Sequence, residues 1–250
     1  MLQRLLFDTA LPSPVRNIPL FAGISDKEKD LLLQEGRLCS CPRKKTVFRQ
    51  GDPITHFYVV CSGTIRLFHE TPDGCEITTD ILTAGDTICE TEIFQLYDAH
   101  LSHAVAVHDV ILVEFSKKWL EEKMLQHNAI LRNMVTALAR RNIMRGVEVE
   151  RQATMTALQL VACFLQHVSD AHDFDPHTFE LPYSKSLIAT RLGMELETFS
   201  RSWSKLKEIG ITVKGKNVHF NNLQSVKQHV CGRCSFMDHC QAYKRVHKTD

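Results

Sequence analysis

The segment from Ser184 to Phe220 constrains the fold of this chain more than any other. Ser184 can begin a helix, because its hydroxyl accepts a hydrogen bond from an unpaired amide two or three residues later. Apolar residues follow at helical spacing as far as Gly193. Glycine adopts a positive φ without steric cost, so Gly193 predicts the end of a short helix.

A second helical pattern follows after a two-residue turn. Its apolar residues recur at i, i+4 and i+7 and are Phe199, Trp203 and Leu206. Gly210 predicts the end of this helix, and two β-rich runs, 211–213 and 218–220, then flank a basic turn at 214–217. A helix, a short turn, a second helix and a hairpin together predict a winged helix-turn-helix.

The second helix carries polar residues on the face opposite its apolar stripe, namely Glu197, Ser200, Arg201 and Ser204. An arginine fork fits guanine O6 and N7, a glutamate accepts from cytosine N4, and a serine bonds in either direction. Followed by a basic turn, such a face suits the major groove and its phosphates. The alternative is a solvated polar face on an ordinary helical hairpin, and the residue pattern alone leaves both open.

A family resemblance favours the first interpretation. The run from Glu197 to Arg201, with Gly210 and the run 213–216, resembles the recognition helix and wing of the cAMP receptor protein/FNR family of bacterial regulators, and Glu-x-x-Ser-Arg is similar to the FNR branch. Two positions depart from the family pattern: Glu195 replaces the usual Ser or Thr cap, and Leu187 replaces a common acidic residue. The resemblance implies a palindromic site with TTGAT-like halves. It also implies these DNA-binding residues: Glu197, Thr198, Ser200, Arg201, Ser184, Lys214 and Lys216.

The charge of the chain is divided unevenly. Residues 1–175 carry 18 Lys+Arg and 23 Asp+Glu, a net charge of −5, whereas residues 176–250 carry 12 and 6, a net charge of +6. The basic charge therefore accompanies the helix-turn-helix. No signal peptide or membrane-spanning run is evident, so we expect a cytoplasmic protein whose nine cysteines are reduced thiols or metal ligands.

Residues 38–115 have a different character from the rest of the chain. Short strand-like runs alternate with glycine-containing turns, which predicts a closed or rolled all-β unit and an α+β fold class overall. The expected strands are 46–48, 57–60, 64–68, 77–82, 104–107 and 111–115. Before this unit we expect an N-terminal arm, residues 1–17, and a short helix capped by Ser25. The β-rich sensor-like domain would then cover residues 18–116.

The turns at Gly51-Asp52 and Gly85-Asp86 and the run 58–65 resemble the β-roll of cyclic-nucleotide-binding domains. That family holds its nucleotide with a Gly-Glu pair and an Arg-Ser pair. Here the two sites read Cys89-Glu90-Thr91 and Leu101-Ser102, so the phosphate-binding Arg is missing. Because an uncompensated buried phosphate is costly, we expect no cAMP binding. His100 and His103 flank the gap, and we interpret them as core or surface residues.

Residues 117–150 form the longest helical pattern. We expect Arg140 and Arg141 on its outer face, opposite a broad apolar seam of Ile130, Leu131, Met134, Val135, Leu138, Ile143 and Met144. The helix could be a core helix of one subunit, but it resembles the family's dimerisation helix, which implies a homodimer joined by a coiled coil. A further helix over 152–168 is expected to open the DNA-binding domain, residues 151–222.

The C-terminal tail, residues 223–250, concentrates three cysteines in ten residues: Cys231, Cys234 and Cys240. The spacing Cys-x2-Cys-x5-Cys suits an iron–sulfur cluster, and zinc sites also use Cys-x2-Cys. It resembles the FNR cluster motif, although in FNR that motif is N-terminal. We favour a 4Fe-4S cluster over zinc, with metal-free redox thiols as a third reading. The candidate fourth ligands are His239, Cys163, Glu148 and Glu150.

The sequence thus predicts a homodimeric transcription regulator whose cluster senses oxygen, nitric oxide or redox state, with RNA polymerase as a partner. The alternative is a small-molecule-gated regulator with a structural zinc tail. No paired carboxylates, nucleophile motif or phosphate-cradling glycine loop supports an enzyme.

Overall fold

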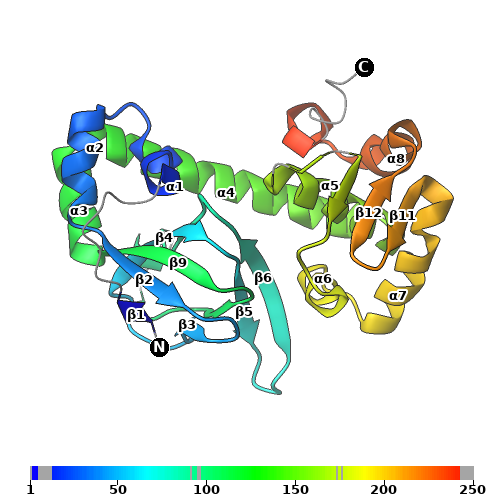
Figure 1. The fold of residues 1–250 in the computed structure, drawn as a ribbon, viewed down its shortest axis with the longest axis horizontal. Helices are drawn as coiled ribbons and strands as arrows, with labels where there is room; N and C mark the ends of the chain where they lie inside the picture. Colours follow the sequence, from blue (N-terminus) through cyan, green and yellow to red (C-terminus); the bar gives the residue numbers. More distant parts are fainter. Residues whose placement is uncertain are drawn as a thin grey trace. The chain divides into compact units, whose positions relative to one another are not determined.

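A computed structural model describes residues 2–4, 13–90, 92–94, 97–172, 174–175 and 177–242. The chain divides into two compact units, residues 1–141 and 142–250. Thr91, residues 5–12 of the expected arm and residues 243–250 of the expected tail lie outside the described residues. No helix among the described residues combines the length and apolar character needed to cross a membrane. The α+β class is confirmed, with a β-rich first unit, a long helix and a helix-turn-helix (Figure 1).

The first unit is built around nine strands in the described residues. They are β1 (Gln3–Arg4), β2 (Arg37–Cys41), β3 (Thr46–Phe48), β4 (His56–Ser62), β5 (Ile65–Glu70), β6 (Glu76–Leu82), β7 (Thr87–Ile88), β8 (His103–Ala106) and β9 (Val110–Ser116). The helical segments are α1 (Ser13–Arg16), η1 (Pro19–Phe21), α2 (Asp26–Leu33), η2 (Glu92–Phe94), α3 (Lys117–Gln126) and the first half of α4 (Asn128–Thr154). Ser25 caps α2 through a reciprocal capping box with Glu28, as the sequence predicts.

Two antiparallel sheets make up the β-roll, in the orders β1-β2-β9-β4-β7 and β3-β8-β5-β6. Apolar side chains from both sheets share one buried core that includes Phe57, Ile65 and Leu112. The tight turn at Gly63 passes so close to the next segment that a Cβ there would lie 2.2 Å from the Asp109 carbonyl oxygen. All six predicted strands are present. Strands β1, β2 and β7 were not predicted, and β1 makes part of the expected arm an edge strand.

The helical pattern of residues 117–150 is not one helix. His127 has extended backbone angles, φ −126° and ψ 99°, and separates α3 from α4. The predicted seam also divides, because Ile130 and Met134 are buried in the core of the β-roll whereas Leu131 and Val135 are exposed in the single chain.

The expected outward position of Arg141 is wrong. Its Nη1 lies 2.7 Å from Glu90 Oε1, and the Glu90 side chain is only 7% exposed. The long arginine side chain reaches the β-roll carboxylate. A buried carboxylate without a partner charge is strongly unfavourable, so pairing with Glu90 outweighs leaving the arginine in solvent.

The second unit contains the helix-turn-helix. Its elements are α5 (Ala157–Ala171), β10 (Thr178–Glu180), α6 (Lys185–Arg191), α7 (Leu196–Lys205), η3 (Leu206–Ile209), β11 (Ile211–Lys214), β12 (Asn217–Phe220), α8 (Leu223–Val230), η4 (Cys231–Arg233) and η5 (Met237–His239). Thr156 caps α5 with Gln159 in a capping box, so the helix predicted from residue 152 begins five residues later. Strand β10 was not predicted and extends the wing hairpin to three strands, β10-β12-β11.

The start of the C-terminal tail is a packed helix. Asn222 caps α8 by accepting a hydrogen bond from the Ser225 amide at 2.9 Å. Val226 and Val230 are fully buried, and α8 contacts α5. Gln159 of α5 donates to the His229 carbonyl at 2.6 Å, which fixes the C-terminal end of α8. The cysteine segment therefore begins directly after a helix end that is held against α5.

Candidate nucleic-acid interface and cysteine centre

Helix α7 has the two faces that the sequence predicts. Phe199 is fully buried, while Trp203 is half-buried with the Lys185 ammonium 5.1 Å from its ring centroid. On the other face Glu197 and Arg201 are exposed. Ser200 is also exposed and Thr198 is half-buried. Glu195 stands at the N-cap without a side-chain cap hydrogen bond, which leaves the first turn without a cap from that side chain.

Arg201 forms a loose ion pair with Glu197, at 3.6 Å, and its side chain is 69% exposed. Exposed pairs at this spacing contribute only about 0.3–0.5 kcal/mol. The guanidinium can therefore leave Glu197 at small cost and bind a base edge.

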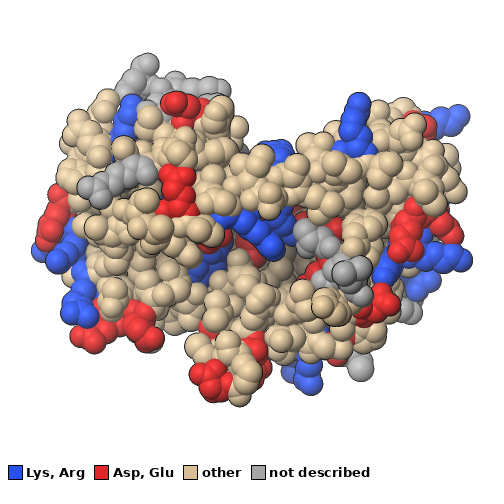
Figure 2. All heavy atoms as spheres, turned by 180° about the vertical axis from the view of Figure 1, so that it is seen from behind, with Lys and Arg blue, Asp and Glu red and all other residues tan. Residues whose placement is uncertain are grey.

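The remaining predicted DNA contacts lie at the ends of elements. Ser184 caps α6, where it accepts a hydrogen bond from the Leu187 amide at 3.2 Å. Lys214 is exposed at the end of β11, and Lys216 lies in the wing turn, 3.6 Å from Glu180. On the face drawn in Figure 2, basic and acidic side chains are interspersed. Lys214 and Lys216 are local groups that could attract phosphate.

The three tail cysteines converge on Cys163 of α5. Burial raises the pKa of the Cys163 thiol to about 12, and the thiols of Cys231, Cys240 and Cys234 contribute to the increase. Because charge effects weaken with distance, these contributions indicate that the four thiols lie near one another, and Arg151 opposes the increase. Burial likewise raises the pKa of Cys231 to about 11. Of the four predicted candidates for the fourth ligand, Cys163 is thus the one that lies near the three tail cysteines.

Arg151, near the end of α4, lies among these thiols. Burial alone would lower the pKa of its guanidinium, but Cys163 and a hydrogen bond to Cys234 raise it overall. Its buried Nε has no hydrogen-bond partner among the described residues. A half-buried cation beside these thiols is suited to a negatively charged group.

Two more side chains of α5 face the cysteines. Cys231 Sγ lies 3.8 Å from Gln166 Oε1, and Cys240 Sγ lies 3.8 Å from His167 Nε2. Burial, with help from Arg151 and Arg191, lowers the pKa of His167 to about 4, so its imidazole is neutral. Sequence reasoning did not identify these residues or Arg151. The available signal was the spacing of residues 163, 166 and 167, which places them on one helical face.

The other three fourth-ligand candidates are engaged elsewhere. Glu150 accepts hydrogen bonds from the Ser235 amide, at 2.8 Å, and from its hydroxyl. Glu148 is paired with Arg191. His239 is exposed, with its ring centroid 5.6 Å from that of Phe236.

In the β-roll, the residues at the expected nucleotide site either contact other side chains or are exposed to solvent. Glu90 is held by Arg141, and Leu101 is 50% exposed. Ser102 is buried and donates a hydrogen bond to Glu92 at 3.3 Å. His103 is half-buried and lies 3.5 Å from Glu70.

Comparison with known proteins assigns both parts of the chain. Residues 38–127 match the family model of the cyclic nucleotide-binding domain, and residues 159–228 match that of the Crp-like helix-turn-helix domain. The transcriptional activator protein FnrA of Stutzerimonas stutzeri is 26% identical over 217 residues, which cover 80% of this chain and 83% of FnrA. The transcriptional activator protein Anr of Pseudomonas aeruginosa is 27% identical over 218 residues, covering 81% and 83%.

The structure of FixK2 from Bradyrhizobium japonicum superposes with a TM-score of 0.70 at 20% identity, over 78% of this chain and 97% of FixK2, which shows a shared fold. The Crp-like domain is a module for binding double-stranded DNA, and regulators of this kind act as dimers and are not enzymes. With a cyclic-nucleotide-binding-like β-roll, a long helix and a Crp-like helix-turn-helix in one chain, the protein belongs to the CRP/FNR family of DNA-binding transcription regulators.

Proposed function

We propose that this regulator is controlled by a 4Fe-4S cluster held by Cys163, Cys231, Cys234 and Cys240. The observation that carries the proposal is that these four thiols lie near one another and beside the half-buried Arg151. Iron–sulfur clusters take cysteine thiolates as ligands. When bound, such a cluster supplies a redox-active group that oxygen and nitric oxide can damage.

The residues around the cysteines support an anionic group. Four thiolates in a buried place would be unfavourable without a counter-charge, and Arg151 provides one. Gln166 and His167 present polar atoms to Cys231 and Cys240, and such outer contacts orient thiolate ligands. Two of the cysteines thus already have polar partners on α5.

Helix α5 connects the cysteine centre with the DNA-reading helix. It carries Cys163 and contacts both α8 and α7. A change in how the segment 231–240 packs on α5 would act on the position of α7 through this one helix. The effect would be a shift in the population of dimers able to place two recognition helices in successive major grooves.

The proposed DNA site rests on the resemblance to FNR and on the exposed polar face of α7. We assign Glu197, Ser200 and Arg201 to base edges, within a palindrome of TTGAT-like halves, and Lys214 and Lys216 to phosphates. RNA polymerase is the expected partner at promoters, and the cytoplasm is the expected location.

The β-roll is proposed not to bind cAMP. The carboxylate that would meet the ribose, Glu90, is engaged by Arg141, and Leu101 offers no charge to a phosphate. A nucleotide phosphate there would lack the charge-assisted hydrogen bonds that offset its burial.

The test is anaerobic purification of the full chain with iron, sulfide and zinc analysis. We expect iron and sulfide in equal amounts, a brown colour that is lost in air, and specific DNA binding that changes with that loss. Serine at Cys163, Cys231, Cys234 or Cys240 should remove most iron, whereas serine at the exposed Cys75 should not. A colourless protein that holds zinc on the tail would replace this proposal with the structural-zinc alternative.

A further inference from the structure

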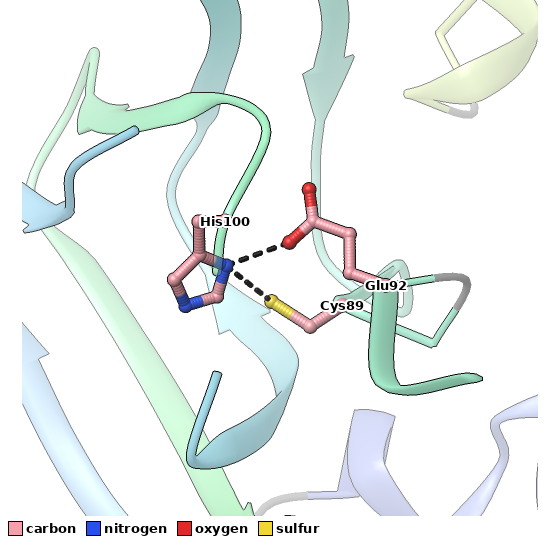
Figure 3. Close-up of side chains that lie close together, drawn as sticks. All are labelled: Cys89, Glu92 and His100. Carbon is pink, nitrogen blue, oxygen red and sulfur yellow. Dashed lines mark hydrogen bonds and ion pairs between the residues drawn. The ribbon is translucent and has the colours of Figure 1, made fainter. Parts of the chain in front are cut away.

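A second group of metal-binding side chains lies inside the β-roll, apart from the tail cysteines. Cys89, Glu92 and His100 point toward one another, and their ligand atoms all lie within 4.8 Å (Figure 3). His100 Nδ1 is 2.6 Å from Glu92 Oε2 and 3.7 Å from Cys89 Sγ. The three side chains come from the residue after β7, from η2 and from the segment before β8.

The surroundings fix these side chains in place. Cys89 is 4% exposed and His100 is 3% exposed, and the Glu92 side chain is 15% exposed. The imidazole of His100 stacks on Phe48, with ring centroids 3.7 Å apart. Ser102 donates to the second carboxylate oxygen of Glu92 at 3.3 Å. A thiol, a carboxyl and an imidazole are thus held together where little water enters.

We propose that Cys89 Sγ, the Glu92 carboxylate and His100 Nδ1 form a binding site for one divalent transition-metal ion, with Zn²⁺ as the best fit. Mixed sulfur, nitrogen and oxygen donors suit borderline metals such as zinc, whereas Mg²⁺ and Ca²⁺ prefer oxygen alone. A thiolate and a carboxylate together neutralise the charge of the ion, so the loaded site carries no net charge in a buried place.

The distances support this assignment. Tetrahedral zinc with these donors places ligand atoms roughly 3.4–3.6 Å apart, from bond lengths of about 2.0–2.3 Å. The Sγ–Nδ1 distance of 3.7 Å is already close to that value. The Nδ1–Oε2 contact of 2.6 Å is a hydrogen bond. It must widen by about 0.8 Å when the ion takes the place of the shared proton. Three protein ligands leave a fourth position for water or a small anion.

The site also has a direct route to the long helix. Glu90, the partner of Arg141 in α4, follows Cys89 in the chain. An ion bound by Cys89 would therefore lie one residue away from Glu90, whose carboxylate holds Arg141 of α4.

The experiment uses the full chain with Cys231, Cys234 and Cys240 changed to serine, so that metal on the tail does not contribute. Co²⁺ is the probe, because a cobalt–thiolate bond gives charge-transfer absorption in the near ultraviolet. We expect one Co²⁺ per chain, displaced by Zn²⁺. Cys89→Ser should abolish the charge-transfer band. Glu92→Gln and His100→Gln should each weaken Co²⁺ binding by more than about tenfold, because loss of a residue that only contacts a ligand already costs about that much.

Two variants serve as matched controls. Cys75→Ser removes an exposed thiol of the same unit, and Ser102→Ala removes a contact to Glu92 without removing a ligand. Cys75→Ser should bind Co²⁺ as the parent does, and Ser102→Ala should keep the band. Equal binding by the parent and all three ligand variants, no Co²⁺ binding, or loss of binding with Cys75→Ser would each overturn the site.

Folding is checked independently by the fluorescence of Trp119, which is buried in the same unit, in a Trp203→Phe background because the chain has a second tryptophan. If the triple-serine chain does not fold, the site is tested by zinc analysis of the chain that keeps its tail cysteines. There Cys89→Ser should hold one zinc ion fewer than the parent after zinc loading, and an equal content refutes the proposal. Iron and sulfide on the tail report separately on the cluster, so either proposal can fail alone.

Discussion

The carboxylate of Glu150 accepts a hydrogen bond from the Ser235 backbone amide at 2.8 Å and another from the Ser235 hydroxyl. Glu150 lies near the end of α4, and Ser235 immediately follows Cys234. These hydrogen bonds, led by that of the hydroxyl, lower the pKa of Glu150, so the carboxylate is charged at neutral pH. The long helix therefore holds the loop between Cys234 and Cys240 through one side chain.

This relationship leads to a prediction about cluster lifetime. Glu150→Ala should leave the cysteines in place but loosen their loop, so the cluster should be lost in air severalfold faster than in the parent chain. The decay of visible absorption after exposure to air measures it. Ser235→Ala should have a smaller effect because it keeps the backbone amide, and Glu121→Ala, an exposed carboxylate on α3, should have none. Equal decay in all four proteins would mean that this contact does not protect the cluster.

The pair formed by Glu90 and Arg141 gives a prediction about stability. Arg141→Ala leaves the 7% exposed Glu90 side chain without its cation, which typically costs about 3–5 kcal/mol of unfolding free energy. The pKa of Glu90 is already raised by burial, although Arg141 opposes the increase, so protonation of Glu90 will recover part of the loss. Arg140→Ala, one residue earlier and exposed, should cost under about 0.5 kcal/mol.

Urea unfolding followed by Trp119 fluorescence measures these costs in a Trp203→Phe background, since the chain has two tryptophans. The double variant Arg141→Ala with Glu90→Gln should be more stable than Arg141→Ala alone, because no buried charge then remains unpaired. If Arg141→Ala and Arg140→Ala unfold at the same urea concentration, the ion pair does not stabilise the β-roll.

Local signals in the sequence predicted much of the DNA-binding unit. Ser184 caps a helix, Gly210 adopts φ +89° at the end of the next one, and Phe199 is buried at the expected position. Each of these depends on a few consecutive residues, whose spacing and backbone preferences are visible in the chain. Strand β7 was missed because two residues carry no periodic pattern.

Features decided by long-range packing could not be predicted in the same way. Arg141 has the same helical pattern as an exposed arginine, and its direction depends on a carboxylate 51 residues earlier in the chain. Cys163 was one of four candidate ligands, since only the docking of α8 on α5 brings it to the tail cysteines. Arg151 had no sequence signal, because a basic residue at the end of a long helix is ordinary.

The absence of cAMP binding is the next prediction. Titration calorimetry of the full chain with cAMP should give no heat of binding, because Glu90 is engaged and no arginine stands at position 101. Binding at micromolar affinity would return the nucleotide pocket to the centre of the sensing mechanism.

The last prediction concerns how the protein reads DNA. Arg201 is exposed on the face of α7 opposite the buried Phe199, and its loose contact with Glu197 leaves it available to a base. Arg201→Ala should cost about 1–3 kcal/mol per half-site and relax the preference for the guanine of TTGAT. Lys214→Ala and Lys216→Ala should weaken binding to all sequences alike and flatten the salt dependence, because each would remove a phosphate contact.

The measurement is a binding titration against the palindrome and a guanine-substituted version, at two salt concentrations. On the substituted site the parent chain and Arg201→Ala should bind with nearly equal affinity, because the partner of the guanidinium is absent from both complexes. The wing variants should keep the parent's ratio between the two sites. If Arg201→Ala instead loses the same affinity on both sites, the arginine binds phosphate, and the reading face of α7 must be assigned to other residues.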